Sequence, residues 1–315
     1  MTKIRALATT FAISVAAVAA SAGPAAAAGA QTLTVPDGIS AGIMVYDRHT
    51  SSVELQYNAH QQFRSASVVK LMIALDYLET NGTNVPLVDL VQLQPMLRSS
   101  DDDAASYLWV KDGWETIVQR VVAKVGLTDS APPVNRGMWG YTAISAADVV
   151  KLYDYILTKA DPAVRDFIMS NLHQSTKCGD DGFDQSFGIQ SAVNRPWAVK
   201  QGWSGFGDTP DPVCSPANPV PPPPGTVPGQ PTTQALSQRL NPAVVGSGER
   251  TLATTTDPGG LDLTRRAMHT TGTVGPNDDK IMVVLTLEPV GTTWQDSADR
   301  ITALTSVVYH ISQWP

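Results

Sequence analysis

The chain has 315 residues, of which 43% are hydrophobic, and it carries a formal net charge of −7. An acidic protein of this kind repels phosphate backbones, so the charge balance argues against nucleic acid as a partner. The length is sufficient for one large domain or two interlocked subdomains around a substantial core.

The N-terminus has the pattern of an export signal. Lys3 and Arg5 precede an apolar run from Ala6 to Ala20 and an Ala-rich stretch from Ala25 to Ala30. This order is typical of a signal peptide, here 1–30, that is removed on export. A transmembrane anchor is the competing interpretation, but the apolar run is shorter than the roughly 20 residues that span a bilayer. We therefore expect a secreted or extracytoplasmic protein with no membrane span after cleavage.

The next elements are a hairpin and a helix. Gly42–Tyr46 and Ser52–Tyr57 are predicted as strands, because each is apolar or alternating and a polar turn joins them. The apolar spacing then predicts a helix from Ser67 to about Thr80. Ser67 would lie in the first turn of this helix.

Mid-chain periodicity predicts further helices, and strands return near the C-terminus. The predicted helices are Asp101–Val110, Trp114–Val125, Ser145–Leu157 and Pro162–Leu172. The predicted strands are Trp197–Trp203, Arg266–Val274 and Ile281–Leu287, followed by a closing helix, Asp296–Gln313.

This order predicts an α+β fold, an antiparallel sheet built from both termini with a mid-chain all-α lobe. The domain would be 31–315, with an α/β part at 31–66 and 190–315 and a helical lobe at 67–175. The segment 209–258 is rich in proline and polar residues, which predicts an extended insertion within the domain.

Cys178 and Cys214 are the only two cysteines. Neither belongs to a C-x-x-C pair or lies near a histidine at metal-ligand spacing, so we expect no metal site. In an oxidising compartment a disulfide between them is the expected state. Two buried free thiols are the alternative, because sequence alone does not show that the two residues come within bonding distance.

Ser67 and Lys70 form an S-x-x-K pair, and their three-residue offset places both side chains on one helical face. A serine hydroxyl becomes a good nucleophile when a base removes its proton, and a partly desolvated lysine can be that base. A surface serine and lysine would explain the pair equally well, since S-x-x-K occurs by chance about once in a chain of this length.

Two further motifs favour a catalytic pair over a surface serine and lysine. Ser100–Asp101–Asp102 opens a predicted mid-chain helix, and Lys200–Gln201–Gly202 lies on a predicted strand. With Ser67–Lys70, their order resembles the S-x-x-K, S-D-N and K-T-G motifs of class A β-lactamases and penicillin-binding proteins. The resemblance covers nearly all of the mature chain except the proline-rich insertion, and it implies a β-lactamase/transpeptidase-like fold.

The resemblance also implies roles. Ser67 would be the acylated nucleophile, Lys70 its base, and Ser100 a proton relay to the leaving group. The substrate-binding positions would be Asp102, Lys200, Gln201, Gly202 and Trp203, with Lys200 as the anchor for an anionic substrate. The backbone N–H groups of Ser67 and Trp203 would form the oxyanion hole. No cofactor is implied.

The sequence departs from the family pattern at three points. Asp102 replaces an amide donor with a carboxylate, which can only accept hydrogen bonds and would pair with Lys70, weakening it as a base. Gln201 replaces a small hydroxyl, and its longer side chain would partly fill the subsite. The loop 128–141 contains no glutamate to position a hydrolytic water, and Asp129 is its only carboxylate.

We therefore expect a secreted serine hydrolase-like protein that transfers acyl groups through Ser67 from an amide or ester and deacylates poorly. The alternative is a catalytically inactive member of the same fold that binds a cell-wall peptide or a protein. The intact proton-transfer residues favour the first, and the altered substrate contacts favour the second. We expect a small-molecule or peptide substrate related to the cell wall, and a monomer.

Overall fold

The computed structural model describes residues 33–215 and 260–312. The predicted signal peptide at 1–30 lies outside these residues, as does the predicted insertion from 216 onward. Within the described part of the chain, no helix has the length and apolar character needed to cross a membrane.

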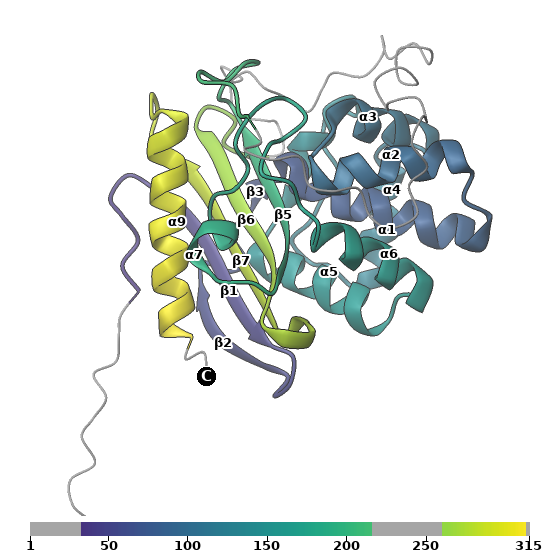
Figure 1. Cartoon of the computed structure of the whole chain (residues 1–315), viewed down its shortest axis with the longest axis horizontal. Coiled ribbons are helices and arrows are strands. Elements are labelled where there is room, and N and C mark those ends of the chain that lie inside the picture. The colour runs from purple at the N-terminus through teal and green to yellow at the C-terminus, as the bar shows by residue number, and fades with distance from the viewer. Residues whose placement is uncertain (1–32, 216–259, 313–315) are drawn as a thin grey trace, which may run out of the picture. The chain divides into compact units, whose positions relative to one another are not determined.

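An antiparallel five-stranded sheet forms the centre of the domain (Figure 1). Its order is β2 (Ser52–Tyr57), β1 (Ser40–Asp47), β7 (Lys280–Glu288), β6 (Arg266–Val274) and β5 (Trp197–Ser204). Because β1 pairs with β7, strands from the two ends of the chain meet in the middle of the sheet. The predicted α+β fold, with an antiparallel sheet built from both termini, is confirmed.

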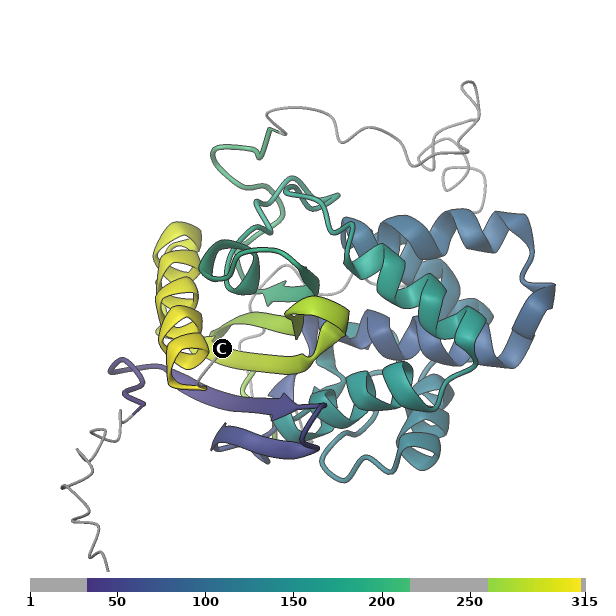
Figure 2. The same ribbon diagram turned by 60° about the horizontal axis from the view of Figure 1, so that its bottom comes forward.

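Helices cover both faces of this sheet (Figures 1 and 2). On one face lie α9 (Trp294–Ile311) and the short α7 (Ile189–Ala192). On the other lies the helical lobe, which consists of α1 (Lys70–Asn81), α2 (Leu87–Arg98), α3 (Asp102–Lys111), α4 (Thr116–Val125), α5 (Ala146–Thr158) and α6 (Pro162–Leu172). The strand β7 is buried along its whole length because both of its faces are covered. Successive side chains of the strand point to opposite faces of the sheet. Val283 and Leu285 pack toward the lobe, whereas Met282 and Val284 pack toward α9.

The helix α2 was absent from the sequence prediction. It contains Pro95 close to its C-terminal end, where the missing N–H removes one hydrogen bond of the helix. The helix is held instead by tertiary packing, since Leu93, Met96 and Leu97 are buried in the core of the lobe.

A tight turn connects the sheet side to the lobe. The short strand β3 (Phe63–Arg64) pairs with β4 (Ala143–Ile144), and a 3₁₀ turn, Ala66–Val69, then leads into α1. The predicted helix from Ser67 to about Thr80 is thus confirmed, with its first turn, which contains Ser67, in 3₁₀ geometry and the α-helix beginning at Lys70. Ala66 has a φ of 45°, a backbone conformation that side-chain-bearing residues seldom adopt and that is frequent at functional sites.

Candidate active site

The turn Ala66–Val69, called the nucleophile turn after the role expected for Ser67, brings Ser67 against the first residue of α1. Lys70 Nζ lies 2.8 Å from Ser67 Oγ. Lys70 is 0% exposed and Ser67 is 6% exposed. The turn is held from both sides, because Ser65 N donates to Thr142 O and Val68 N donates to Ser65 O. The pair is thus part of the buried structure, which excludes the interpretation as a surface serine and lysine.

The amine of Lys70 has three acceptors. Besides Ser67 Oγ, it contacts Ser100 O at 2.6 Å and Asp102 Oδ1 at 2.5 Å. An ammonium group has three protons to donate, so this arrangement matches the charged form of lysine. The sequence-based expectation that Asp102 pairs with Lys70 agrees with this contact. A carboxylate beside the amine stabilises the charge that must be lost before Lys70 can act as a base.

Ser100 and Lys200 complete the polar network. Ser100 lies between α2 and α3 with a φ of 58°, and its hydroxyl is in contact with Lys200 Nζ. Burial holds the pKa of Lys200 well below its ordinary value, the charge of Lys70 acts in the same direction, and Asp102 and Asp181 oppose them. The lowered pKa makes the ammonium of Lys200 a stronger proton donor than that of an ordinary lysine, which suits it to proton transfer to Ser100.

The strand β5 passes directly over the nucleophile turn, and Gly202 is the residue that permits this. A Cβ atom on Gly202 would lie 3.0 Å from Ser65 O and 3.4 Å from Ser67 N. The first distance is tighter than most contacts of a real Cβ, and Val68 Cγ2 would lie equally close at 3.0 Å, so a side chain here would push the turn and the strand apart. Lys200, on the same face of the strand, reaches Ser100, which brings the three predicted motifs together around Ser67.

Gln201 and Trp203 have different surroundings. The amide of Gln201 is buried and donates to Gln185 O at 3.2 Å and Phe187 O at 2.6 Å. Trp203 lines a narrow pocket together with Ser67, Asp102, Asp181, Ser204, Gly205, Phe206 and Gly207. Gln201 is not among these lining residues. Its amide holds the segment before α7 and does not fill this pocket.

The loop 128–141 brings a tryptophan to Lys70. The amine of Lys70 lies 4.9 Å from the centroid of the Trp139 ring, and the indole is fully buried and donates to Ser106 Oγ. This contact is a cation–π interaction, which also favours the charged amine. The carboxylate of Asp129 is instead hydrogen-bonded to His60 Nδ1 and Ser145 Oγ.

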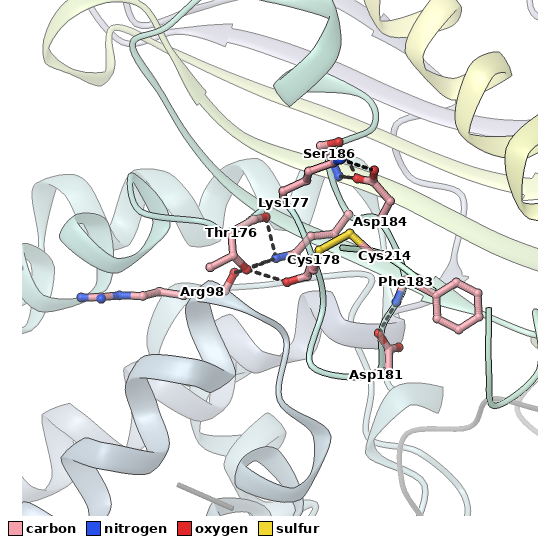
Figure 3. The surroundings of a disulfide bond; sticks show 10 residues. Arg98, Thr176, Lys177, Cys178, Asp181, Phe183, Asp184, Ser186 and Cys214 are labelled. Carbon is pink, nitrogen blue, oxygen red and sulfur yellow. Dashed lines mark hydrogen bonds and ion pairs between the residues drawn. A yellow bond between two sulfur atoms is a disulfide. The ribbon is translucent and has the colours of Figure 1, made fainter. Parts of the chain in front are cut away.

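A disulfide lies in the loop that carries Asp181, one of the residues that line the pocket (Figure 3). Cys178 and Cys214 are bonded, with their Cα atoms 5.6 Å apart, which confirms the predicted pairing. Beside the bond, Cys214 N donates to Gly182 O. In the same loop, Asp181 accepts from Phe183 N and from Trp203 Nε1. The cross-link therefore connects the segment that carries Asp181 with the segment that follows β5.

Asp181 and Phe206 were not found from the sequence, although both line the pocket. Neither lies in a recognisable motif, and the one signal near Asp181 is the cysteine three positions before it. Among the described residues, no group of three or more His, Cys, Asp or Glu side chains could hold a metal ion.

The arrangement of the sheet and the helical lobe identifies the fold of this protein. It is the fold of the class A β-lactamases and of PBP-A. PBP-A superposes with a TM-score of 0.57 at 12% identity, covering 88% of this chain and 91% of that chain. A class A β-lactamase from Mycobacterium abscessus gives a TM-score of 0.54 at 14% identity, covering 87% and 94%. The expected resemblance is thus confirmed for the fold.

Relatives in sequence are more similar but cover less of the chain. A protein named "Putative lipoprotein LppW" from Mycobacterium tuberculosis is 39% identical over 173 residues, which are 53% of this chain and 54% of that protein. A protein of the same name from Mycobacterium bovis matches equally. The chain thus spans about half the length of the curated relatives it matches. No family model matches the sequence.

Proposed function

We propose that this protein is an extracytoplasmic serine hydrolase that transfers acyl groups from an amide or ester to Ser67 and releases them slowly. The observation that carries the proposal is the 2.8 Å contact between Lys70 Nζ and Ser67 Oγ in a buried turn, with Ser100 and Lys200 beside it. The fold shared with class A β-lactamases and PBP-A supports the same type of chemistry.

In the proposed reaction, Lys70 first gives one ammonium proton to solvent. The neutral amine then takes the proton of Ser67 while Ser67 Oγ attacks the carbonyl carbon of the substrate. The backbone N–H groups of Ser67 and Trp203 stabilise the negative charge of the tetrahedral intermediate. Collapse of this intermediate breaks the bond to the leaving amine or alcohol, which takes a proton from Ser100. The serine is then left as an acyl ester, and Lys200, in contact with Ser100, restores the proton that Ser100 gave up.

Slow release follows from the groups that surround the ester. Hydrolysis needs a water that is held and deprotonated next to the acyl carbon. The loop 128–141 contains no glutamate for this purpose, and its Trp139 packs an apolar ring against Lys70. Acylation should therefore be faster than deacylation.

An extracytoplasmic location is part of the proposal. It is supported by the export-signal pattern at 1–30, by the disulfide, which persists in oxidising compartments, and by the name of the relative LppW. The substrate would be a small molecule or peptide related to the cell wall. A PBP-A variant has been described as an acyl-enzyme complex with penicillin G, which makes that compound a suitable first probe.

One observation favours a second candidate, a catalytically inactive protein that binds a cell-wall peptide or a protein in the same pocket. The ammonium of Lys70 is held by Asp102 and Trp139 together, and a lysine kept charged in this way cannot take a proton from Ser67. Binding would then need the pocket and not the nucleophile.

Intact-protein mass spectrometry separates the two candidates. The protein is incubated with penicillin G, a panel of other β-lactams and a fluorophosphonate serine probe. A covalent adduct that is lost in Ser67→Ala supports the hydrolase. If no reagent in the panel modifies the wild-type protein while its near-ultraviolet circular dichroism shows a packed fold, the inactive binding protein is the better description.

A further inference from the structure

A buried arginine precedes the nucleophile turn and reaches across to the wall of the pocket. Arg64 lies three positions before Ser67, on β3, and is 1% exposed. Its Nε donates to Ser204 Oγ at 3.0 Å, and its Nη2 lies 3.4 Å from Ser204 O. Two further guanidinium contacts are with Asp262 O at 2.7 Å and Arg265 O at 2.5 Å. One side chain thus holds both the end of β5 and the segment that leads into β6.

The backbone of Arg64 is held from the sheet as well. Thr286 N donates to His269 Nδ1, which leaves the ring proton on Nε2, and His269 Nε2 lies 2.8 Å from the carbonyl oxygen of Arg64. Burial lowers the pKa of His269 to about 4, so the ring is neutral near physiological pH and keeps this tautomer. His269 is the cross-strand partner of Gly202, the residue over which the nucleophile turn lies.

These contacts fix the relative position of two parts of the site. Ser67 is on the nucleophile turn, whereas Trp203 and Ser204 belong to the end of β5, and all three line the same pocket. The Arg64 side chain is a direct bridge between these two parts. Acylation depends on the distance between the nucleophile and the oxyanion donors, and a misplacement of about 1 Å can lower a rate roughly a hundredfold.

Taking the proposed function as its basis, we propose that Arg64 is a positioning residue: its guanidinium sets the spacing between Ser67 and the end of β5, and so controls the rate of acylation. The planar guanidinium carries five donors in a fixed geometry and can hold several acceptors at once, which a lysine amine cannot do over the same span. The role therefore requires the shape of arginine and not merely its charge.

The test compares Arg64→Lys, Ser204→Ala and the double variant with the wild-type protein, using the fluorophosphonate probe. Two quantities are measured, the saturating rate constant for modification of Ser67 and the probe concentration at half-saturation. Arg265→Lys is the matched control, because Arg265 also holds backbone and hydroxyl oxygens, those of Gly38, Ser40, Leu287 and Glu288. Circular dichroism and thermal unfolding establish that each variant is folded.

Arg64→Lys should lower the saturating rate roughly tenfold or more, with the half-saturation concentration changed by less than about twofold. Arg64 acts partly through Ser204, so the two substitutions should not be additive. Adding Ser204→Ala to Arg64→Lys should lower the rate by a smaller factor than Ser204→Ala lowers it in the wild-type protein. A folded Arg64→Lys that reacts at the wild-type rate would overturn the positioning role. So would a loss of rate in Arg64→Lys no greater than that in Arg265→Lys, and so would fully additive effects of the two substitutions in the double variant. If the probe does not modify the wild-type protein, the proposed function is wrong, and the positioning role, which depends on it, is wrong as well.

Discussion

Asp102 and Lys70 form an ion pair with 2.5 Å between the carboxylate oxygen and the amine, and their side chains are 10% and 0% exposed. A pair so well shielded from water is strong, because little solvent screens it. It stabilises the charged amine, which is the form that cannot accept the proton of Ser67.

Asp102→Asn should therefore accelerate acylation. The change removes the carboxylate and supplies an amide donor toward the substrate. We expect a roughly tenfold rise in the acylation rate, which corresponds to about 1.4 kcal/mol of activation free energy. Stopped-flow rates with one chromogenic ester measure the effect. Asp103→Asn, an exposed neighbour on α3, is the matched control for the change in net charge. An unchanged or slower Asp102→Asn would mean that the carboxylate does not oppose Lys70.

Any β-lactam or activated ester that reacts should leave a long-lived adduct on Ser67. The loop 128–141 offers no glutamate, and Trp139 packs against Lys70. We expect a burst of product equal to the amount of enzyme and then slow turnover. Product release followed over time, with intact-mass measurements on the same samples, reports both phases. Rapid steady turnover without a burst would contradict the prediction and indicate that another group activates water.

The buried His269 should make stability depend on pH. Burial lowers the pKa of its imidazole from 6.5 in the unfolded chain to about 4 in the folded protein, and the charge of Arg64 acts in the same direction. The folded state therefore binds the proton less readily than the unfolded chain. The contribution of the neutral ring is fully present above pH 6.5 and is lost as the pH falls toward 4.

Urea unfolding of the wild-type protein and of His269→Gln, near pH 7 and near pH 4, measures this term. The wild-type protein should lose up to about 3 kcal/mol more than the variant over this interval. The comparison between the two proteins removes the contribution of the other titrating groups. Equal losses would show that His269 is not held neutral by its surroundings.

The disulfide between Cys178 and Cys214 should add about 3 to 4 kcal/mol by restricting the unfolded chain. Replacing both cysteines with serine should lower the melting temperature by on the order of 10 °C. The same variant should react more slowly at Ser67, because the cross-linked loop carries Asp181, which holds Trp203. A non-reduced peptide map is the control for the wild-type bond. An unchanged melting temperature would mean that the cross-link closes a loop that is already restricted in the unfolded state.

The sequence was informative where the physical signal is local. Hydrophobic periodicity located the strands of the sheet and most helices, and the S-x-x-K spacing identified Ser67 and Lys70 as neighbours. The helix α2 was missed because Pro95 interrupts the usual helical pattern, and only its packing in the lobe compensates for this. Alternation along β5 could have shown that Gln201 lies on the opposite face from Lys200 and Gly202.

Other parts of the site depend on contacts between distant segments. Asp181 reaches the pocket through a loop held by the disulfide, and Arg64 reaches Ser204 across the interface between the nucleophile turn and the sheet. Trp139 comes to Lys70 from a loop with no regular pattern. None of these contacts has a spacing or period in the sequence, since each depends on how three-dimensional packing brings separate segments together.

Because β1 pairs with β7, the sheet cannot close until the chain has been synthesised through Glu288. The helices α1 to α6 are consecutive in the chain and can associate early, whereas β5 and β6 dock only with the last strands. A partly made chain would therefore carry Ser67 and Lys70 next to each other but have no Gly202 or Ser204 against them. If Ser67 reacts as proposed, we expect such a nascent chain to be chemically inert, so that reactivity arises only after β5, β6 and β7 have docked.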